Sequence, residues 1–227
     1  NLDDIQKIKT AIKSAQSVVC VGGGLVGFEM CDVISRLKIL TSLIFREPYF
    51  FGNILDAQAG SILESQLIKN NIQIINDSQV QKFTGADADA VTGVITSKGQ
   101  HIKGDLVIVG VGGCPQLGFI NSKILNINKG VVVNEYLETN IPNVWAAGDC
   151  AENYHPIFGE HIQLGNWANS QIQGKIAGQN MADKKQIMTS VSAYITTGLG
   201  VNLAFIGSLK TGDANREIIK TYHRAYI

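Results

Sequence analysis

Six residues near the start of the chain have the types and spacing needed to bind phosphate groups. They form a G-x-G-x-x-G pattern between an apolar run and a helical pattern: Gly22-Gly23-Gly24-Leu25-Val26-Gly27. Gly22 permits a tight turn, Gly24 lets the backbone approach a pyrophosphate, and Gly27 allows the helix to pack closely on the strand. The phosphates would lie at the free N–H groups and the positive end of that helix. The pattern therefore predicts a dinucleotide-binding site.

Two charged residues after the next apolar run are candidates for the ribose end of that dinucleotide. The fingerprint expects an acidic residue about 20 residues further on, at the end of the second strand, where it binds the ribose 2′-hydroxyl. Here the run ends in Phe45-Arg46-Glu47. Glu47 could bind the ribose of NAD, whereas Arg46 could pair with the 2′-phosphate of NADP. Either could instead be a solvated loop charge. The sequence favours NADPH only slightly, so it predicts NAD(P) and leaves the choice between NADH and NADPH open.

A second motif lies in the later half of the chain, where an apolar segment ends in the Gly148-Asp149 turn. A tight turn at a strand's carboxyl end leaves the Asp149 carboxylate able to accept hydrogen bonds from ligand hydroxyls, because α/β proteins bind ligands at that edge. By itself, a Gly-Asp pair is a common turn.

The remaining reactive residue types form no recognisable site. Cys20, Cys31, Cys114 and Cys150 make no closely spaced pair, and most lie among apolar or small residues, which favours buried thiols in a reducing cytoplasm. The spacing of Cys150 with the following histidines matches no metal-ligand pattern. We therefore predict no metal site and no catalytic side chain.

Composition excludes several classes of protein. Apolar residues make up 45% of the 227 residues and charged residues 17%, so the chain is not disordered. Lys+Arg and Asp+Glu are both 19, which gives a net charge of +0 and no basic surface for nucleic acid or an anionic membrane. No apolar run reaches the roughly 18–20 residues of a membrane span.

Strands and helices alternate along the first half of the chain, which predicts an α/β fold. We expect helices over residues 1–15, 26–37 and 54–70, and buried strands over residues 17–21, 40–45, 72–75 and 105–110. Three alternating segments between the last two strands predict a small antiparallel meander, over residues 80–83, 90–96 and 101–102.

A second unit is expected beyond residue 120. Its predicted elements are strands over residues 130–133 and 144–147, a helix over residues 167–182, and strand-rich segments over residues 193–207 and 217–227. The apolar spacing of the helix assigns Ile172 and Ile176 to its core face.

Three segments, in this order, resemble the FAD-dependent pyridine nucleotide-disulfide oxidoreductase superfamily. They are VVCVGGGLVGFE (18–29), DLVIVGVGGCP (105–115) and TNIPNVWAAGDC (139–150). They are similar to the nicotinamide-nucleotide turn, the strand leading to a second glycine motif, and the A-x-G-D motif of the flavin domain. Residues 1–15 and 166–182 are similar to segments of the ferredoxin- and rubredoxin-reductase-like members, and an NADH oxidase-like branch fits as well.

The resemblance implies a Rossmann-like three-layer NAD(P)-binding domain plus the second half of a similar FAD-binding domain. It assigns a connecting helix to residues 1–15, the NAD(P) domain to 16–118, the FAD-domain half to 119–190, and the start of a truncated C-terminal dimerisation domain to 191–227. The chain is then expected to be an internal piece of a longer flavoenzyme, without its N-terminal FAD-binding segment.

Individual positions take roles by the same resemblance. Glu29 would lie near the nicotinamide and Gly112 beside the nicotinamide ribose. The Gly148-Asp149 turn would hold the ribityl or phosphate part of FAD. Trp167 and Ala168 would begin a helix whose positive end points at the pyrimidine edge of the flavin.

The activity implied is that of a cytoplasmic NAD(P)H-dependent flavoprotein oxidoreductase, which passes a hydride from the nicotinamide to FAD and electrons to an acceptor. The acceptor stays open between ferredoxin or rubredoxin, nitrite, oxygen or peroxide, and a disulfide. The absence of a C-x-x-C motif disfavours the thioredoxin-reductase-like branch. The resemblance also implies a homodimer formed through the C-terminal domain. The alternative function is a non-catalytic dinucleotide-binding module or redox sensor.

Overall fold

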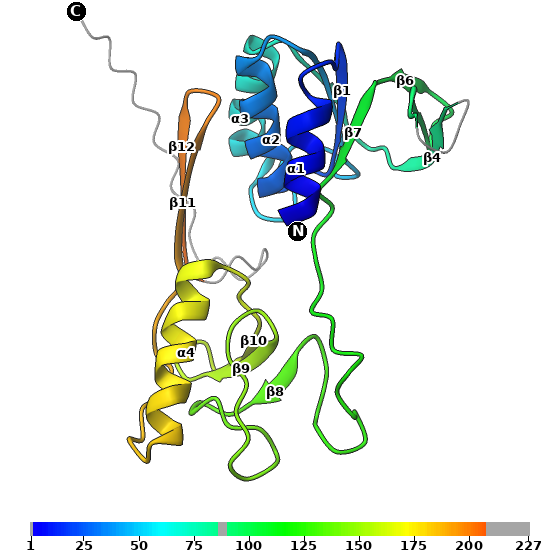
Figure 1. Cartoon of the computed structure of the whole chain (residues 1–227). Helices are drawn as coiled ribbons and strands as arrows, with labels where there is room; N and C mark the ends of the chain where they lie inside the picture. The colour runs from blue at the N-terminus through cyan, green and yellow to red at the C-terminus, as the bar shows by residue number, and fades with distance from the viewer. Residues whose placement is uncertain (1, 86–89, 208–227) are drawn as a thin grey trace, which may run out of the picture. The chain divides into compact units, whose positions relative to one another are not determined.

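A computed structural model describes residues 2–85 and 90–207 of the chain (Figure 1). These residues form two compact units, of which unit 1 runs to Gly110 and unit 2 begins at Val111. The strand-rich segment expected over residues 217–227 lies outside the described residues.

Unit 1 is built on a parallel sheet with the strand order β3-β2-β1-β7. Its strands are β1 (Ser17–Val21), β2 (Leu40–Ile44), β3 (Ile72–Ile75) and β7 (Leu106–Val109), and its helices are α1 (Leu2–Ala11), α2 (Leu25–Arg36) and α3 (Ala57–Lys69). The chain adds β2 and β3 on one side of β1 and later returns to add β7 on the other side. The carboxyl ends of β1 and β7 therefore flank the point where the strand order reverses, which is where such sheets bind ligands.

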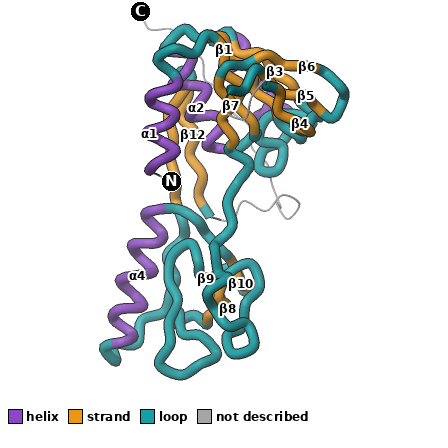
Figure 2. Tube along the Cα trace, turned by 45° about the vertical axis from the view of Figure 1, so that its right-hand side comes forward, coloured by secondary structure: helices purple, strands orange, loops and turns teal. Residues whose placement is uncertain are grey.

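The predicted antiparallel meander forms the third layer of unit 1 (Figure 2). Its strands are β4 (Val80–Thr84), β5 (Gly93–Thr96) and β6 (His101–Lys103). Val94 and Ile102 of the meander share a buried cluster with Val19 and Val21 of β1. Cys20, which alternates with these valines, instead contacts Cys31 of α2. Helices and meander thus cover opposite faces of the sheet, and the predicted three-layer α/β fold is confirmed (Figure 1).

The ends of two elements in unit 1 are fixed by side chains. Helix α3 begins three residues later than its apolar pattern predicts, because the Asp56 carboxylate accepts the N–H of Ala59 at 2.7 Å and caps the helix. The Asp105 carboxylate, just before β7, accepts the backbone N–H of Gln16 at 2.7 Å and the hydroxyl of Ser17 at 2.9 Å. These contacts hold the starts of β1 and β7 together.

Unit 2 contains a three-stranded sheet and one long helix. The sheet has the order β10-β9-β8, in which β8 (Val131–Val133) is parallel and β10 (Glu160–Ile162) antiparallel to β9 (Ala151–His155). Val131 and Val133 pack in one buried cluster with Ala177 of α4 (Trp167–Met181). The helix therefore covers one face of β8.

The strand predicted over residues 144–147 was wrong. Its one pairing is an isolated bridge between Glu138 and Trp145, and no strand among the described residues pairs with the rest of the segment. Conversely, β9 and β10 were not predicted. Glu152, Asn153 and His155 of β9 are all buried, so the strand does not have the apolar pattern of a core strand.

The buried face of α4 also differs from the expectation. Asn169, Gln173 and Ala177 are its buried residues, whereas Ile172 is 38% exposed. Ile176, the other residue assigned to the core face, is partly buried and packs against the apolar cluster of unit 2, as predicted. The buried side of the helix therefore combines two amides with apolar residues.

The strand-rich character predicted for residues 193–207 was confirmed. This segment forms the hairpin of β11 (Ala193–Gly198) and β12 (Val201–Ile206). Leu199 and Gly200 have φ values of 51° and 80°, which suits the two-residue turn of a twisted hairpin. None of the helices in the described ranges is both long and apolar enough to cross a bilayer.

Candidate functional site

The glycine turn after β1 brings strand and helix into direct contact. Gly22 has a φ of 121°, a region that side-chain-bearing residues rarely adopt. A Cβ on Gly27 would overlap the carbonyl oxygen of Gly22, and a Cβ on Gly23 would lie 2.9 Å from the Cβ of Phe45. The close packing predicted for Gly27 is therefore present. A side chain at residue 23 would clash with Phe45, which directly follows β2.

The N-terminus of α2 is open. Gly24 is its N-cap, no described side chain caps the helix, and no atom would lie within 4 Å of a Cβ on Gly24. Helices α3 and α4 differ from α2, because the side chain of Asp56 caps α3 and that of Asn166 caps α4. The helix start therefore has no side-chain acceptor in the described part of the chain, and a phosphate could supply acceptors at its positive end.

The end of β7 lies against the same helix end. A Cβ on Gly110 would lie 2.8 Å from Cγ1 of Val26, so a side chain at residue 110 would clash with the first turn of α2. Val26 is 53% exposed and Leu25 is half-buried, whereas Glu29, one turn further on, is exposed. Gly112 has a φ of 96°, and a Cβ there would meet no atom within 4 Å.

Glu47 reaches the glycine turn from the end of β2. Its carboxylate oxygen Oε2 would lie 3.3 Å from a Cβ on Gly23, and only 16% of its side chain is exposed. Arg46 is 71% exposed, and its Nε atom lies 3.1 Å from Oε1 of Glu47. The acidic residue is thus directed towards the turn, and the arginine is bound to that acid.

In unit 2, the turn that carries Asp149 is fixed by α4. Gly148 has a φ of 84°, and its N–H donates to Oε1 of Gln173 at 2.7 Å. The hydroxyl of Ser170 donates to Oδ1 of Asp149 at 2.8 Å, and Gln163 Nε2 donates to the carbonyl of Asp149 at 2.8 Å. The exposed carboxylate is therefore held in one orientation while remaining accessible to a ligand hydroxyl.

The first residues of α4 are accessible as well. Trp167 is 79% exposed and Ala168 is exposed, while the Asn166 side chain accepts the N–H of Asn169 at 2.8 Å. Asn169 in turn donates from Nδ2 to the carbonyl of Leu164 at 2.9 Å. These two hydrogen bonds hold the start of the helix, and the exposed indole of Trp167 can contact a neighbouring group.

The predicted residues thus fall into two sets, one in each unit. Unit 1 brings the glycine turn, Arg46 and Glu47 together at one sheet edge, and unit 2 brings the Gly148-Asp149 turn together with α4. Sequence reasoning missed Ser170 and Gln173, because an amide or hydroxyl within a helix carries no signal of the atom it will contact. It also missed Asn166, although an asparagine directly before a helical pattern is an N-cap signal.

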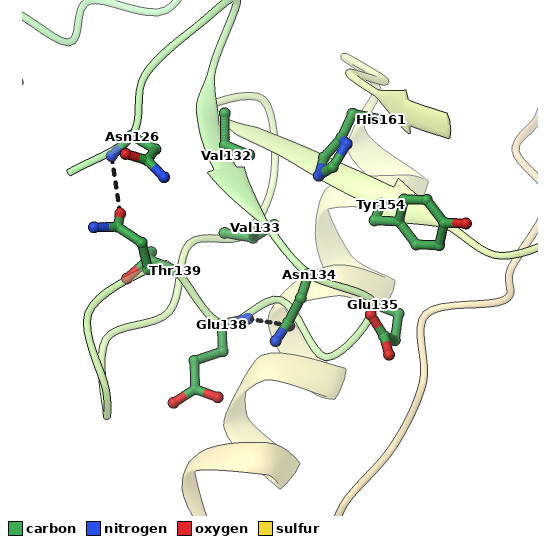
Figure 3. A pocket seen from close by; sticks show the side chains of 10 residues that line it. Asn126, Val132, Val133, Asn134, Glu135, Glu138, Thr139, Tyr154 and His161 are labelled. Atoms are coloured by element: carbon green, nitrogen blue, oxygen red, sulfur yellow. Dashed lines mark hydrogen bonds between the residues drawn. The ribbon is translucent and has the colours of Figure 1, made fainter. Parts of the chain in front are cut away.

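An open pocket in unit 2 lies apart from these residues (Figure 3). It is lined by Val132 and Val133 of β8, by Tyr154 and His161, and by polar residues of the adjoining loops: Asn126, Asn134, Glu135, Glu138, Thr139 and Asn140. None of the predicted site residues lines it.

The histidines and thiols do not assemble into a reactive centre in the described part of the chain. His155 pairs with Glu160 and His161 with Tyr154, so the two imidazoles lie on opposite faces of the hairpin. A hydrogen bond with Cys20, together with burial, raises the pKa of Cys31, which keeps it a thiol. Within the described ranges, no group of three metal-ligating residues is present.

A family model described as "Pyridine nucleotide-disulphide oxidoreductase" matches residues 1–181. The chain belongs to this family. The expected resemblance is confirmed, and pyridine nucleotide-disulphide oxidoreductases are FAD-dependent enzymes that use NAD(P)H.

Known relatives of this pyridine nucleotide-disulphide oxidoreductase are longer proteins. Nitrite reductase (NAD(P)H) of Bacillus subtilis (strain 168) is 30% identical over 159 residues, which cover 70% of this chain and 20% of that enzyme. Rubredoxin-NAD(+) reductase of Ectopseudomonas oleovorans is 23% identical over 213 residues, which cover 94% of this chain and 55% of the relative. The chain therefore spans between a fifth and about half of the length of these relatives.

Among solved structures, the ferredoxin reductase of the CYP199A2 system from Rhodopseudomonas palustris has a TM-score of 0.85 and 22% sequence identity. The match covers 91% of this chain and 51% of the reductase. At this identity the likeness shows the fold alone.

Proposed function

We propose that this chain provides the NAD(P)H-binding domain and the second half of the FAD-binding domain of a flavoprotein oxidoreductase that passes electrons to an acceptor. The observation that carries the proposal is the uncapped N-terminus of α2 behind the glycine turn, at the edge where the strand order reverses. When bound, the nicotinamide and flavin supply hydride and electron transfer, and the protein supplies binding and orientation.

In unit 1, backbone groups would hold the coenzyme. The first N–H groups of α2 donate to the pyrophosphate oxygens, and the open side of Gly24 lets the phosphates reach them. The end of β7 approaches Val26 in the first turn of α2, and the nicotinamide half would extend towards this strand end. Glu29 is the residue of unit 1 that we place near the nicotinamide. Gly112, which belongs to unit 2, is the residue that we place beside the nicotinamide ribose.

Glu47 supports a preference for NADH. Its carboxylate is directed at the glycine turn and is mostly buried, so a ribose with free hydroxyls can donate to it. A 2′-phosphate at that position would face a negative charge. Arg46 is bound to the same carboxylate, which lowers its value as a phosphate ligand.

In unit 2, the fixed carboxylate of Asp149 would accept hydrogen bonds from FAD. Ser170 holds the carboxylate, and Gln173 holds the preceding turn. The N-terminus of α4, with Trp167 and Ala168, would face the pyrimidine edge of the flavin, where the helix's positive end favours negative charge.

The domain limits follow the same proposal: a connecting helix at residues 1–15, the NAD(P) domain at 16–118, the FAD-domain half at 119–190, and a dimerisation domain beginning at 191. A small redox protein is the acceptor that we favour, because similar proteins include reductases of rubredoxin and of ferredoxin. The free thiols favour a cytoplasmic protein.

The deciding experiment is an anaerobic titration of the purified protein with FAD and then with NADH or NADPH, followed by absorbance. A flavin band that bleaches on addition of NADH supports the proposal. Tight nicotinamide binding in a protein that retains no flavin would instead support the alternative of a non-catalytic dinucleotide-binding module.

A further inference from the structure

One side chain joins the N-terminus of α4 to the base of the β11–β12 hairpin. The Oδ1 atom of Asn166 accepts the N–H of Asn169 at 2.8 Å, which caps the helix. Its Nδ2 atom donates to Oγ of Ser192 at 2.7 Å. Ser192 directly precedes β11, so both ends of one planar amide are in use, one on the helix and one on the hairpin.

The hairpin base is held at several neighbouring points. The carbonyl of Ser190 accepts Nε2 of His155 at 3.2 Å, and the carbonyl of Ser192 accepts the N–H of Gly207 at 2.8 Å. The N–H of Met188 donates to the carbonyl of Glu135 at 2.8 Å. Ser192 is therefore a fixed acceptor, and it restricts the rotation of the Asn166 amide.

Capping alone does not require this arrangement. A cap needs one acceptor, such as the Asp56 oxygen that accepts the N–H of Ala59 in α3. Asn166 also has a donor, and the donor is directed at the hairpin. Because the amide is rigid, any rotation that follows Ser192 moves Oδ1 relative to the N–H of Asn169.

We propose that Asn166 is a positioning residue that sets the flavin-facing end of α4 according to the position of the hairpin base. The inference rests on the proposed function, in which the N-terminus of α4 faces the flavin. The carbonyl of Asn166 also accepts the N–H of Ser170, whose hydroxyl holds Asp149. A shift at Ser192 is therefore passed to the helix start and to the carboxylate proposed to bind FAD.

The test compares three variants of the flavin-loaded protein. Ser192→Ala removes the hairpin contact and leaves the cap intact. Ser190→Ala is the matched control, because only the backbone carbonyl of Ser190 makes a contact described above. Ser192→Thr keeps the hydroxyl. The readouts are hydrogen exchange at the Asn169 amide, the dissociation constant of FAD, and the flavin reduction potential.

We expect Ser192→Ala to speed hydrogen exchange at the Asn169 amide by about 2- to 12-fold, which is the range for one lost hydrogen bond. The dissociation constant of FAD should rise within the same range, and the flavin reduction potential should shift. Ser190→Ala and Ser192→Thr should match the wild type. Equal behaviour of Ser192→Ala and Ser190→Ala, or failure of Ser192→Thr to match the wild type, would overturn the inference. If the wild type binds no FAD, the proposed function fails, whereas exchange at Asn169 still tests the link to the hairpin.

Discussion

The N–H of Gly148 and the side chain of Gln173 are hydrogen-bonded at 2.7 Å, with Gln173 fully buried. The other end of the same amide donates to Oδ1 of Asn153 at 3.2 Å, which links the Gly148-Asp149 turn, α4 and β9 through one residue. A buried hydrogen bond therefore holds the turn, and the position of the turn depends on Gln173, which belongs to no sequence motif.

Replacing that glutamine should destabilise the protein. Gln173→Leu would leave the Gly148 N–H and the Asn153 amide oxygen buried without their partner, at a cost of about 1–3 kcal/mol each. Urea unfolding should show a loss of about 2–6 kcal/mol in the free energy of unfolding, the sum of the two costs. The exposed Gln171→Leu on the same helix is the control and should stay within about 0.5 kcal/mol of the wild type. Equal stability of the two variants would contradict the network.

Two glycines of the first motif should respond differently to alanine. Gly27→Ala should lower both the melting temperature and nucleotide affinity, because its Cβ would overlap the carbonyl of Gly22. Gly24→Ala should lower the melting temperature less than Gly27→Ala, because its Cβ meets open space and only the N-cap preference for glycine is lost, and it should weaken nucleotide binding. Gly24→Asp should abolish binding by placing a charge where the pyrophosphate lies. Calorimetric titration together with thermal unfolding separates the two effects, and unchanged affinity in Gly24→Asp would remove the site from Gly24.

Coenzyme preference should depend on Glu47. Glu47→Gln removes the charge, so the ratio of NADPH to NADH affinity should rise by about tenfold, which corresponds to about 1.4 kcal/mol. Arg46→Glu should move the ratio in the opposite direction. Steady-state kinetics and binding with both coenzymes measure the ratio. An unchanged ratio in Glu47→Gln would mean that the carboxylate does not face the ribose.

Binding of FAD should depend on both members of the Ser170–Asp149 pair. Asp149→Asn removes the charged acceptor and should weaken FAD binding by about 10- to 100-fold, the effect of losing a hydrogen bond to a charged group. Ser170→Ala frees the carboxylate and should have a smaller effect of the same sign. Fluorescence titration of FAD gives both constants. A larger loss in Ser170→Ala than in Asp149→Asn would show that the helix, and not the carboxylate, binds the flavin.

Acid should weaken unit 1 through Asp105. Hydrogen bonds from the backbone of Gln16, and then from Ser17, hold the pKa of Asp105 below its ordinary value of 3.8 in the folded protein. The carboxylate therefore stabilises the fold above the ordinary value, and this stability is lost as the pH falls through the lowered pKa. Asp105→Asn should unfold with a shallower pH dependence below about pH 4 in urea titrations. An unchanged pH dependence would show that the contact is not formed in solution.

The sequence predicted unit 1 well because its signals are local. A buried run, a glycine turn and a helical stripe define the first βαβ unit, and each occurs within a few residues. The first residue of α3 was not predicted, because the apolar pattern begins before Asp56, which caps the start of the helix.

Unit 2 was harder to predict because polar side chains are buried in it beside its apolar cluster. Residues 144–147 have the composition of a strand, but a strand also needs a partner, and none pairs with this segment in the described part of the chain. Asn169 and Gln173 take the buried positions on α4 that the apolar pattern assigned to Ile172. Buried amides need hydrogen-bond partners, and the partners of Gln173, which are Gly148 and Asn153, are distant in sequence.

Because α2 has no capping side chain among the described residues, a bound coenzyme would stabilise the folded protein. A capping side chain stabilises a helix by about 1 kcal/mol, and α2 has none among the described residues. A ligand that supplies the missing acceptors favours the native state in proportion to the logarithm of its concentration above the dissociation constant. Under the proposed function, a cell depleted of the dinucleotide would hold more protein with a frayed α2, and proteases would clear it sooner. The abundance of the enzyme would then follow the supply of the coenzyme it consumes.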